Sequence, residues 1–469
     1  MTTKTISVED ARNYATRAED HIFDKKSADA SGKTIQKIAV ALANADGGEF
    51  VVGISDDREE PDPEKRWKGR ESVEAFNPIL QALFEISPTL AMEPIFLHSS
   101  EYLGYVLLVR IEKSMVVHHT ADNTVYVRVG AQSLPLRDPQ RIMELQFAKG
   151  AVSFEDQTLS ELRTEEISDA TELGRFLAAY SPRTDPLEFI TNQNLVDRTS
   201  WHPRVAGILL FNDNPSATLP RKCAVKIARY ETKEDDPERD HLKDILTLEG
   251  PLYPLIHSTV KKTTEIMSSV SVWTTAGLRT MQYPPEAIWE VMVNAFIHRD
   301  YSISDDIQVY IFDNRIEIVS PGKLPGFITP ANILESRYSR NPKIVRTLSR
   351  YPDPPNKDLG EGLNTAFQKM MEWKLKKPEI IEDGNCVKVV IPHTPLATPA
   401  EAILEFLANN PTITNRQARE ITGIRSENTM KREFYALRDA GIIEMVPELR
   451  GSSAAWRKKI ELTRLGNPG

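Results

Sequence analysis

The segment Thr34–Asp57 constrains the fold most, because it predicts a helix, a tight turn and a strand in direct succession. Asp46-Gly47-Gly48 ends the predicted helix, since glycine adopts the left-handed backbone that a sharp reversal requires. The run Phe50–Ile54 predicts a short buried strand, and Asp56 and Asp57 follow it at once. Residues at helical spacing form the stripe that we expect to be buried, namely Ile35, Ile38, Ala39, Leu42 and Ala43.

Further charged residues precede this segment. Glu19 and Asp24 lie upstream, with Lys26 beside them. Together with Asp56 they would gather carboxylates around one strand end, as a divalent metal site for phosphodiester chemistry requires. The alternative is that Glu19 and Asp24 are solvated surface charges and that Asp56 and Asp57 only begin a loop.

The whole chain of 469 residues is long enough for about three domains. Its formal charge of −9 argues against binding polyanions over the whole surface, so any nucleic-acid contact must use local basic patches. Cys223 and Cys386 lie far apart and make no metal or redox spacing. With no apolar N-terminal signal and no long apolar run, we expect a cytoplasmic protein without membrane contact.

A second group of polar residues lies on the helix predicted over Tyr283–Tyr301. Glu290, Asn294 and His298 are four residues apart, so they stack on one face of this helix. A carboxylate, a carboxamide and an imidazole in line could activate a water and hold Mg²⁺ beside a triphosphate. The alternative is an ordinary polar helix face.

The neighbouring segments predict a mixed α/β unit. Asp306–Val319 predicts two strands around a turn. The apolar run Val205–Phe211 and the segment Cys223–Tyr230 predict buried strands, and Leu252–Met267 predicts a helix. Gly360-Glu361-Gly362 opens another helix, where a glycine pair lets phosphate oxygens reach backbone N–H groups.

After a proline-rich linker, the last 70 residues or so predict a separate small domain. Helices are expected over Pro399–Asn409, over Thr414–Thr422 and from Ser426 to about Ala440, followed by a β-hairpin. This order resembles a winged helix-turn-helix, whose third helix enters the major groove of DNA. A use in protein contacts or dimerisation is the alternative. The basic residues expected at phosphates are Lys431, Arg432, Arg438, Arg450, Arg457, Lys458 and Lys459.

Residues 8–138 carry a resemblance to a known family. Asp24-x-Lys26, the pattern AxANxxGG, the pattern GxxDD and the closing segment Val125–Leu136 resemble the Schlafen AlbA_2 domain. The resemblance implies nucleic-acid binding, and in eukaryotic Schlafen proteins it implies an endonuclease for transfer and ribosomal RNA. It also implies Mg²⁺ or Mn²⁺ on Glu19, Asp24 and Asp56, although Asp24 stands where the family usually has Glu.

Residues 200–392 carry a second resemblance. The order NAxxHRDY, RIEIxxPGxL, SRNP and GxG is similar to the GHKL-type (HATPase_c_4-like) module of ATP-binding, RecG-like regulators. The usual adenine-reading acidic residue is replaced here by Ser320-Pro321-Gly322. The resemblance implies ATP, with Glu290 as general base, Asn294 on Mg²⁺, Gly322 near adenine, Gly360 and Gly362 near the phosphates, and Arg340 at the γ-phosphate.

The predicted fold class is therefore α/β (α+β) multidomain. It comprises an AlbA_2 domain over residues 1–138, a helical connector over 139–199, a GHKL-like sandwich over 200–392 and a winged helix over 393–469. One hypothesis is a metal-dependent endoribonuclease acting on structured RNA such as tRNA, gated by ATP and serving stress or antiphage defence. The alternative is an ATP-responsive DNA-binding regulator without catalysis in the N-terminal domain. We also expect a homo-oligomer.

Overall fold

The structure is a computed structural model, and the residues that it describes are 2–274, 277–326, 328–335, 338–356, 362–393, 399–422, 424, 426–447 and 454–459. They form two compact units. The first unit comprises Met1–Trp373 with Lys377–His393, and the second comprises Lys374–Lys376 with Thr394–Gly469.

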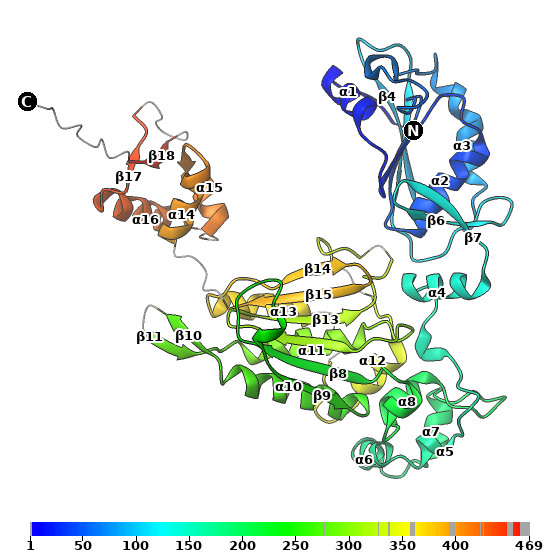
Figure 1. The fold of residues 1–469 in the computed structure, drawn as a ribbon, viewed down its shortest axis with the longest axis vertical. Helices are drawn as coiled ribbons and strands as arrows, with labels where there is room; N and C mark the ends of the chain where they lie inside the picture. The colour runs from blue at the N-terminus through cyan, green and yellow to red at the C-terminus, as the bar shows by residue number, and fades with distance from the viewer. Residues whose placement is uncertain are drawn as a thin grey trace, which may run out of the picture. The chain divides into compact units, whose positions relative to one another are not determined.

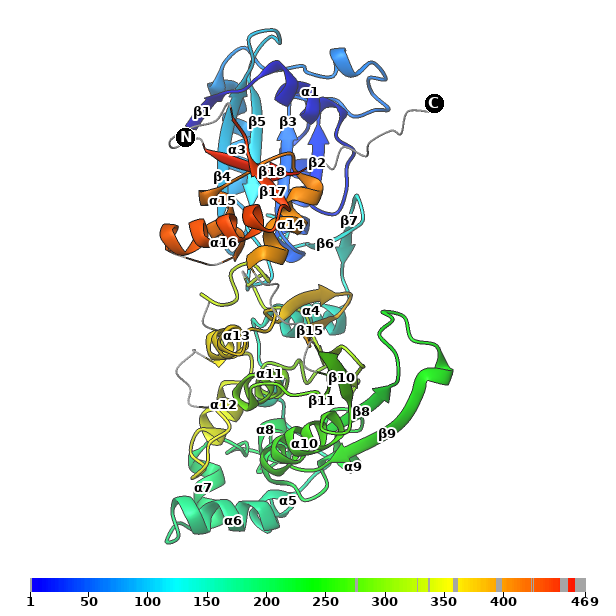
Figure 2. The same cartoon turned by 90° about the vertical axis from the view of Figure 1, so that its left-hand side faces the viewer.

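The first unit begins with a five-stranded sheet of order β1-β4-β5-β3-β2, and Figure 2 shows the last four of these strands side by side. β1 pairs with β4 and β2 with β3 in parallel, whereas the other neighbours are antiparallel. The strands are β1 (Thr2–Thr5), β2 (Phe23–Lys26), β3 (Gly48–Val52), β4 (Met92–His98) and β5 (Val106–Ile111).

Helices cover both faces of this sheet. Residues of α2 (Gly32–Asn44) and α3 (Asn77–Phe84) share one apolar core with Phe50, Phe96 and Leu107. Residues of α1 (Val8–Thr16) share a second core with the opposite face of the strands. Two short 3₁₀ turns, η1 (Pro63–Lys65) and η2 (Val73–Phe76), lie in the connection between β3 and α3.

The predicted helix, turn and strand over Thr34–Asp57 are confirmed. Every residue of the expected stripe on α2 is buried. The turn uses Gly47 and Gly48 at φ +77° and +140°, and a Cβ on Gly48 would lie 2.3 Å from the carbonyl oxygen of Ile22. Asn44, at the end of α2, donates to the backbone oxygens of His118 and Tyr126 at 2.8 and 2.9 Å. Asn44 thereby fastens the hairpin of β6 (Val125–Val129) and β7 (Gln132–Leu136) to α2.

The connector is helical. α4 (Pro139–Lys149) ends at Gly150, which is left-handed at φ +77°. A Cβ on Gly150 would lie 2.2 Å from the hydroxyl oxygen of Tyr338, and that hydroxyl donates to the Gly150 oxygen at 2.6 Å. The remaining elements are η3 (Phe154–Asp156), α5 (Glu165–Ser168), α6 (Thr171–Tyr180), α7 (Pro186–Asn192), α8 (Val205–Phe211) and α9 (Pro215–Thr218).

The prediction of a strand over Val205–Phe211 is wrong, because this segment forms helix α8. All seven of its residues are buried, and a continuous apolar run does not distinguish a buried helix from a buried strand. Gly207 lets α8 approach its neighbours, since a Cβ there would lie 2.3 Å from Cδ1 of Ile167.

The second sheet has six strands in the order β14-β15-β13-β12-β8-β9, and Figure 1 labels all of them except β12. β8 pairs with β12 in parallel, and the other neighbours are antiparallel. The predicted strand near Cys223–Tyr230 and the hairpin within Asp306–Val319 are both present. The strands are β8 (Ala224–Tyr230), β9 (Leu242–Glu249), β12 (Ile307–Ile311), β13 (Arg315–Pro321), β14 (Glu379–Asp383) and β15 (Cys386–Pro392).

Helices α10 and α13 both pack against α11, which contacts β13. The helix expected over Leu252–Met267 is confirmed. The helix expected over Tyr283–Tyr301 is present but shorter, because it ends at Ile297 and His298 is its C-cap. The elements of this region are η4 (Arg239–His241), α10 (Leu252–Met267), β10 (Ser271–Thr274), β11 (Gly277–Thr280), α11 (Pro285–Ile297), α12 (Pro342–Leu348) and α13 (Gly362–Glu372).

Among its described residues, the second unit has three helices and a small sheet of order β16-β18-β17. Ser426 caps the third helix by accepting from the Thr429 N–H, as expected. The three helices and the two later strands occur in the predicted order, but the short strand β16 between α14 and α15 was not predicted. The classification as a winged helix stays a prediction. The elements are α14 (Pro399–Asn409), β16 (Ile413–Thr414), α15 (Asn415–Thr422), α16 (Glu427–Asp439), β17 (Ile443–Met445) and β18 (Ala455–Lys458).

The predicted class, a multidomain mixture of α and β structure, is confirmed. Within the described part of the chain, no helix has both the length and the apolar character needed to cross a membrane.

Candidate functional site

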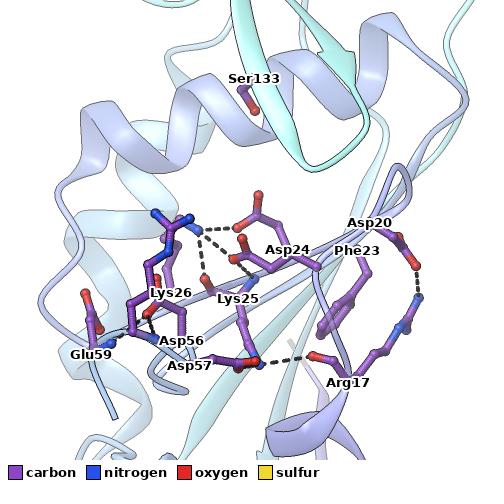
Figure 3. A network of polar contacts seen from close by, with 12 residues as sticks. Arg17, Asp20, Phe23, Asp24, Lys25, Lys26, Asp56, Asp57, Glu59 and Ser133 are labelled. Carbon is purple, nitrogen blue, oxygen red and sulfur yellow. Dashed lines mark hydrogen bonds and ion pairs between the residues drawn. The ribbon is translucent and has the colours of Figure 1, made fainter. Parts of the chain in front are cut away.

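The first candidate site is an ion cluster at the end of β2, shown in Figure 3. Lys26 lies between two carboxylates, with its Nζ 2.5 Å from Oδ1 of Asp24 and 2.9 Å from Oε1 of Glu19. Arg128, from β6, lies 2.6 Å from the other oxygen of Asp24. Burial alone would lower the pKa of Lys26, but attraction to Asp24 and Glu19 outweighs it and raises this pKa. Lys26 therefore stays charged between the two acids.

Asp56 and Asp57 have partners of their own. Oδ1 of Asp56 accepts from the backbone N–H groups of Glu59 and Arg58 at 2.8 and 2.9 Å, which lowers the pKa of Asp56. Oδ1 of Asp57 pairs with Nζ of Lys25 at 2.7 Å and with Nη1 of Arg66 at 2.9 Å. Asp56 thus caps the loop that follows β3, and Asp57 neutralises a buried lysine.

This arrangement does not fit a divalent metal ion as it stands. Among the residues that the structure describes, no three His, Cys, Asp or Glu side chains are grouped to hold a metal. Glu19 and Asp24 do converge on one cation, but that cation is the ammonium of Lys26. Metal ligation by Glu19, Asp24 and Asp56 therefore stays a prediction, and it would require Lys26 to be displaced.

The second candidate site is a cavity of about 1070 Å³ beside α11. Its size lies at the upper end of typical ligand pockets. One wall is the polar face of α11, so the structure brings Glu290, Asn294 and His298 together at one cavity. The other lining residues that matter here come from β13, β15, the segment after β13 and α13: Ile318, Ser320, Gly322, Lys323, Leu324, Tyr338, Ser339, Gly362, Val387 and Val389.

The polar face of α11 is arranged tightly. Nδ2 of Asn294 donates to the backbone oxygen of Glu290 at 2.7 Å, and its amide oxygen has no hydrogen-bond partner in the described part of the chain. The first residue of α13 lies against Glu290, because a Cβ on Gly362 would be 2.2 Å from its Oε2. Glycine at position 362 thus lets α13 begin directly beside the carboxylate. Gly360 lies outside the described residues.

His298 borders the cavity at the far end of α11. His298 keeps accessible surface where it lines this cavity. Removal from bulk water, together with the positive charge of Arg340, lowers the pKa of His298 to about 4. The imidazole is therefore neutral near pH 7, and it can donate and accept hydrogen bonds without adding charge.

The loop after β13 is held in place by the buried residues Asp300 and Arg340. Gly322 has φ +110°, and a Cβ there would lie 2.5 Å from Cβ of Asp300. Arg340 pairs with Asp300 at 2.7 Å, and both side chains are almost fully buried. The structure thus places Arg340 behind the loop, outside the set of lining residues, and its contact with a γ-phosphate stays a prediction. Ser320, at the position of the missing acid, donates to the Ala295 oxygen at 2.7 Å.

The basic residues expected at phosphates in the second unit are exposed, and half of those that the structure describes are in ion pairs. Lys431 pairs with Glu427 at 2.7 Å, Arg438 with Asp439 at 2.7 Å, and Arg457 with Glu444 at 2.8 Å. Arg432, Lys458 and Lys459 are exposed, and the described residues offer them no ion pair. Arg450 lies outside the described residues.

Reasoning from the sequence missed the residues that neutralise the acids. Arg128 holds Asp24, and Lys25 holds Asp57, although neither stood out in the sequence. Alternation along a strand marks which side chains point inward, but it cannot say which distant acid one of them meets. Lys323 was missed in the same way. It lines the cavity and also reaches Asp46 of the N-terminal domain.

The fold and the cavity define a multidomain α+β protein with a ligand-sized cavity beside its second sheet. Residues 19–137 match the family described as Schlafen, AlbA_2. Residues 304–391 match the HATPase_c_4 family, described as "Putative ATP-dependent DNA helicase recG C-terminal". The chain therefore contains a domain similar to Schlafen AlbA_2 and, after it, an ATPase-like module. These two domains point to a nucleic-acid-related, ATP-linked function.

Among solved structures, the DIP2311 protein from Corynebacterium diphtheriae is similar at 18% identity and a TM-score of 0.41. The match covers 94% of this chain and 92% of that chain. No curated protein matches the chain.

Proposed function

We propose that the protein binds nucleic acid and that ATP in the cavity beside α11 regulates this binding. The observation that carries the proposal is the convergence of Glu290, Asn294 and Gly362 on one cavity of about 1070 Å³. Apolar side chains such as Ile318 and Val389 provide a surface for a base, and the polar face of α11 provides groups for the phosphate end.

The residues of this cavity suit a magnesium nucleotide. The amide oxygen of Asn294 is a suitable Mg²⁺ ligand, and the carboxylate of Glu290 can accept a proton from an attacking water. A bound Mg²⁺ would neutralise negative charge on the phosphates. The proposal includes hydrolysis of ATP with Glu290 as the general base. The neutral His298 contributes hydrogen bonds.

The nucleic-acid side of the proposal rests on α16 and β18 of the second unit. Arg432 and Lys458 are exposed cations that the described part of the chain leaves without an ion pair, so they are available to phosphates. The partner is DNA or RNA, and the Schlafen AlbA_2 domain adds a second surface. A regulator of this type needs no cleavage chemistry in the N-terminal domain.

A second candidate function is cleavage of structured RNA such as tRNA, which would suit a stress or antiphage role. It is favoured by the convergence of Glu19 and Asp24 on one cation position beside Asp56. Lys26 is held charged there, and an ammonium can stabilise charge on a phosphate. Binding of Mg²⁺ or Mn²⁺ by these acids is the alternative to this use of Lys26, because it requires the ammonium to be displaced.

Direct measurement with the full chain tests both candidates. ATP binding is measured by calorimetry with and without Mg²⁺, in the parent and in Asn294→Ala. We expect at least a tenfold loss of ATP affinity in Asn294→Ala, about 1.4 kcal/mol. Gln308→Ala, in the neighbouring strand β12 and outside the cavity lining, is the control. Equal ATP affinity in Asn294→Ala and the parent would show that the cavity is assigned wrongly.

Nucleic-acid binding and cleavage are measured on labelled tRNA, single-stranded DNA and double-stranded DNA, with and without ATP and metal. A change in nucleic-acid affinity on adding ATP, without new fragments, supports the regulator. Metal-dependent RNA fragments that disappear in Glu19→Gln support the second candidate. Glu19 is the better probe than Asp24, because its side chain is partly exposed and Asp24 holds a buried arginine.

A further inference from the structure

The wall of the cavity and the Schlafen AlbA_2 domain share a cluster of charges. Nζ of Lys323 lies 3.4 Å from Oδ2 of Asp46 and 3.9 Å from Oε1 of Glu382. Nζ of Lys113 lies 3.4 Å from the other oxygen of Asp46 and 3.7 Å from Oε2 of Glu382. Two lysines and two acids therefore alternate, with Asp46 and Lys113 from the N-terminal domain and Lys323 and Glu382 from the ATPase-like module.

The backbone of the cavity loop is held by the same groups. The Leu324 N–H donates to Oε2 of Glu382 at 3.0 Å, and the Leu324 oxygen accepts from Nζ of Lys113 at 3.2 Å. A Cβ on Gly326 would lie 2.0 Å from the Met115 side chain, so the loop passes close to the N-terminal domain. A ligand that shifts this loop therefore acts directly on Lys113 and Asp46.

Lys323 is the member of the cluster that is free to exchange partners. Its side chain is 37% exposed, it lines the cavity, and its ion pairs among the described residues are long. Pairs of this exposure are each worth at most about 1 kcal/mol. An anionic ligand in the cavity can attract this ammonium at low cost.

Asp46 leads from the cluster to the acids of the N-terminal domain. It lies in the turn between α2 and β3, and its Oδ2 is 2.9 Å from Nε2 of His21. His21 belongs to the segment that carries Glu19 and Asp24 into β2. A continuous set of contacts thus runs from the cavity through Lys323, Asp46 and His21.

We propose that Lys323 and Asp46 form the contact through which ATP in the cavity changes the conformation of the segment carrying Glu19 and Asp24. This inference rests on the proposed ATP binding beside α11. ATP draws the Lys323 ammonium away from Asp46, and Asp46 is left with Lys113 and His21. The coupling is reciprocal, so whatever binds this segment changes ATP affinity by the same factor.

The test uses the full chain with ATP as the probe, by calorimetry and by hydrogen exchange of residues 17–26. We expect ATP to change exchange in this segment of the parent, and Asp46→Asn to abolish the change. Since the parent must give up the Lys323–Asp46 pair, Asp46→Asn should bind ATP as tightly as the parent or up to about fivefold more tightly. Weaker ATP binding in Asp46→Asn would contradict the proposal.

Controls separate the two proposals. Lys33→Met breaks an exposed ion pair to Asp122 in the same domain and should leave the response to ATP intact. ATP binding without any exchange change in the parent, or with an undiminished change in Asp46→Asn, overturns the coupling alone. Absence of ATP binding in the parent overturns the proposed function as well.

Discussion

Nη1 of Arg128 lies 2.6 Å from Oδ2 of Asp24, and their side chains are only 0% and 3% exposed. This pair joins β6 to β2, and the same guanidinium donates to the backbone oxygens of Asp20 and Phe23. Asp24 is therefore a structural partner of a buried cation, whatever chemistry it also performs.

Replacing Asp24 by Ala should destabilise the N-terminal domain by about 3–5 kcal/mol, because a buried arginine loses its counter-ion. Thermal denaturation followed by circular dichroism measures the effect. Glu64→Gln is the control, since it breaks an exposed pair with Arg12 in the same domain and should change stability much less than Asp24→Ala. Equal stability of the two variants would show that the Arg128 pair contributes little.

Gly322→Ala should destabilise the ATPase-like module by about 2 kcal/mol or more and lower its ATP affinity. The new Cβ would require an unfavourable φ and would push Asp300 away from Arg340. Gly384→Ala is the matched control, because Gly384 is also left-handed, at φ +57°, but has open space around it. Gly384→Ala should lower the free energy of unfolding by only about 1 kcal/mol. The free energies of unfolding of both variants are measured by denaturation. Similar losses of stability would show that contact with Asp300 is unimportant.

Glu155 should make stability depend on pH. Burial raises its pKa to about 7 although it accepts from the N–H groups of Lys343 and Ile344. Between the ordinary value near 4.5 and about 7, the folded protein binds this proton and the unfolded chain does not, so stability falls as pH rises. The melting temperature of the parent, minus that of Glu155→Gln, should therefore decrease from pH 4.5 to 7.5. A constant difference would contradict the raised pKa.

Arg432→Ala and Lys458→Ala should each weaken nucleic-acid binding and reduce the slope of log affinity against log salt by about 1. Lys431→Ala is the control, because Lys431 is paired with Glu427 on α16 and should matter less. Fluorescence anisotropy at several salt concentrations measures the slopes. Unchanged slopes in Arg432→Ala and Lys458→Ala would place the nucleic-acid surface elsewhere.

Local elements could be predicted from the sequence because their causes are local. The stripe on α2, the Gly47-Gly48 turn and the Ser426 cap each depend on residues a few positions apart. The spacing of Glu290, Asn294 and His298 likewise indicated one face of α11, and that face lines a cavity. The helix α8 was not predicted because seven consecutive apolar residues show no apolar–polar periodicity that would distinguish a helix from a strand.

Partnerships between distant charges could not be predicted. Lys26 is two residues from Asp24, yet Asp24 also meets Arg128, which is 104 positions away. Lys323 meets Asp46 across 277 positions. A charge pattern shows which residues are available, whereas tertiary packing decides which of them meet. The candidate metal site was therefore inferred from acids whose distant cationic partner, Arg128, could not be predicted.

The contact at Gly150 bears on how these domains can be recombined. Gly150 lies in the connector, where its left-handed φ of +77° and the nearby Tyr338 hydroxyl of the ATPase-like module both favour glycine. The connector is therefore not an interchangeable spacer. A chimera that grafts this Schlafen domain onto another partner must carry over both the glycine and its facing tyrosine, or redesign the junction as a whole.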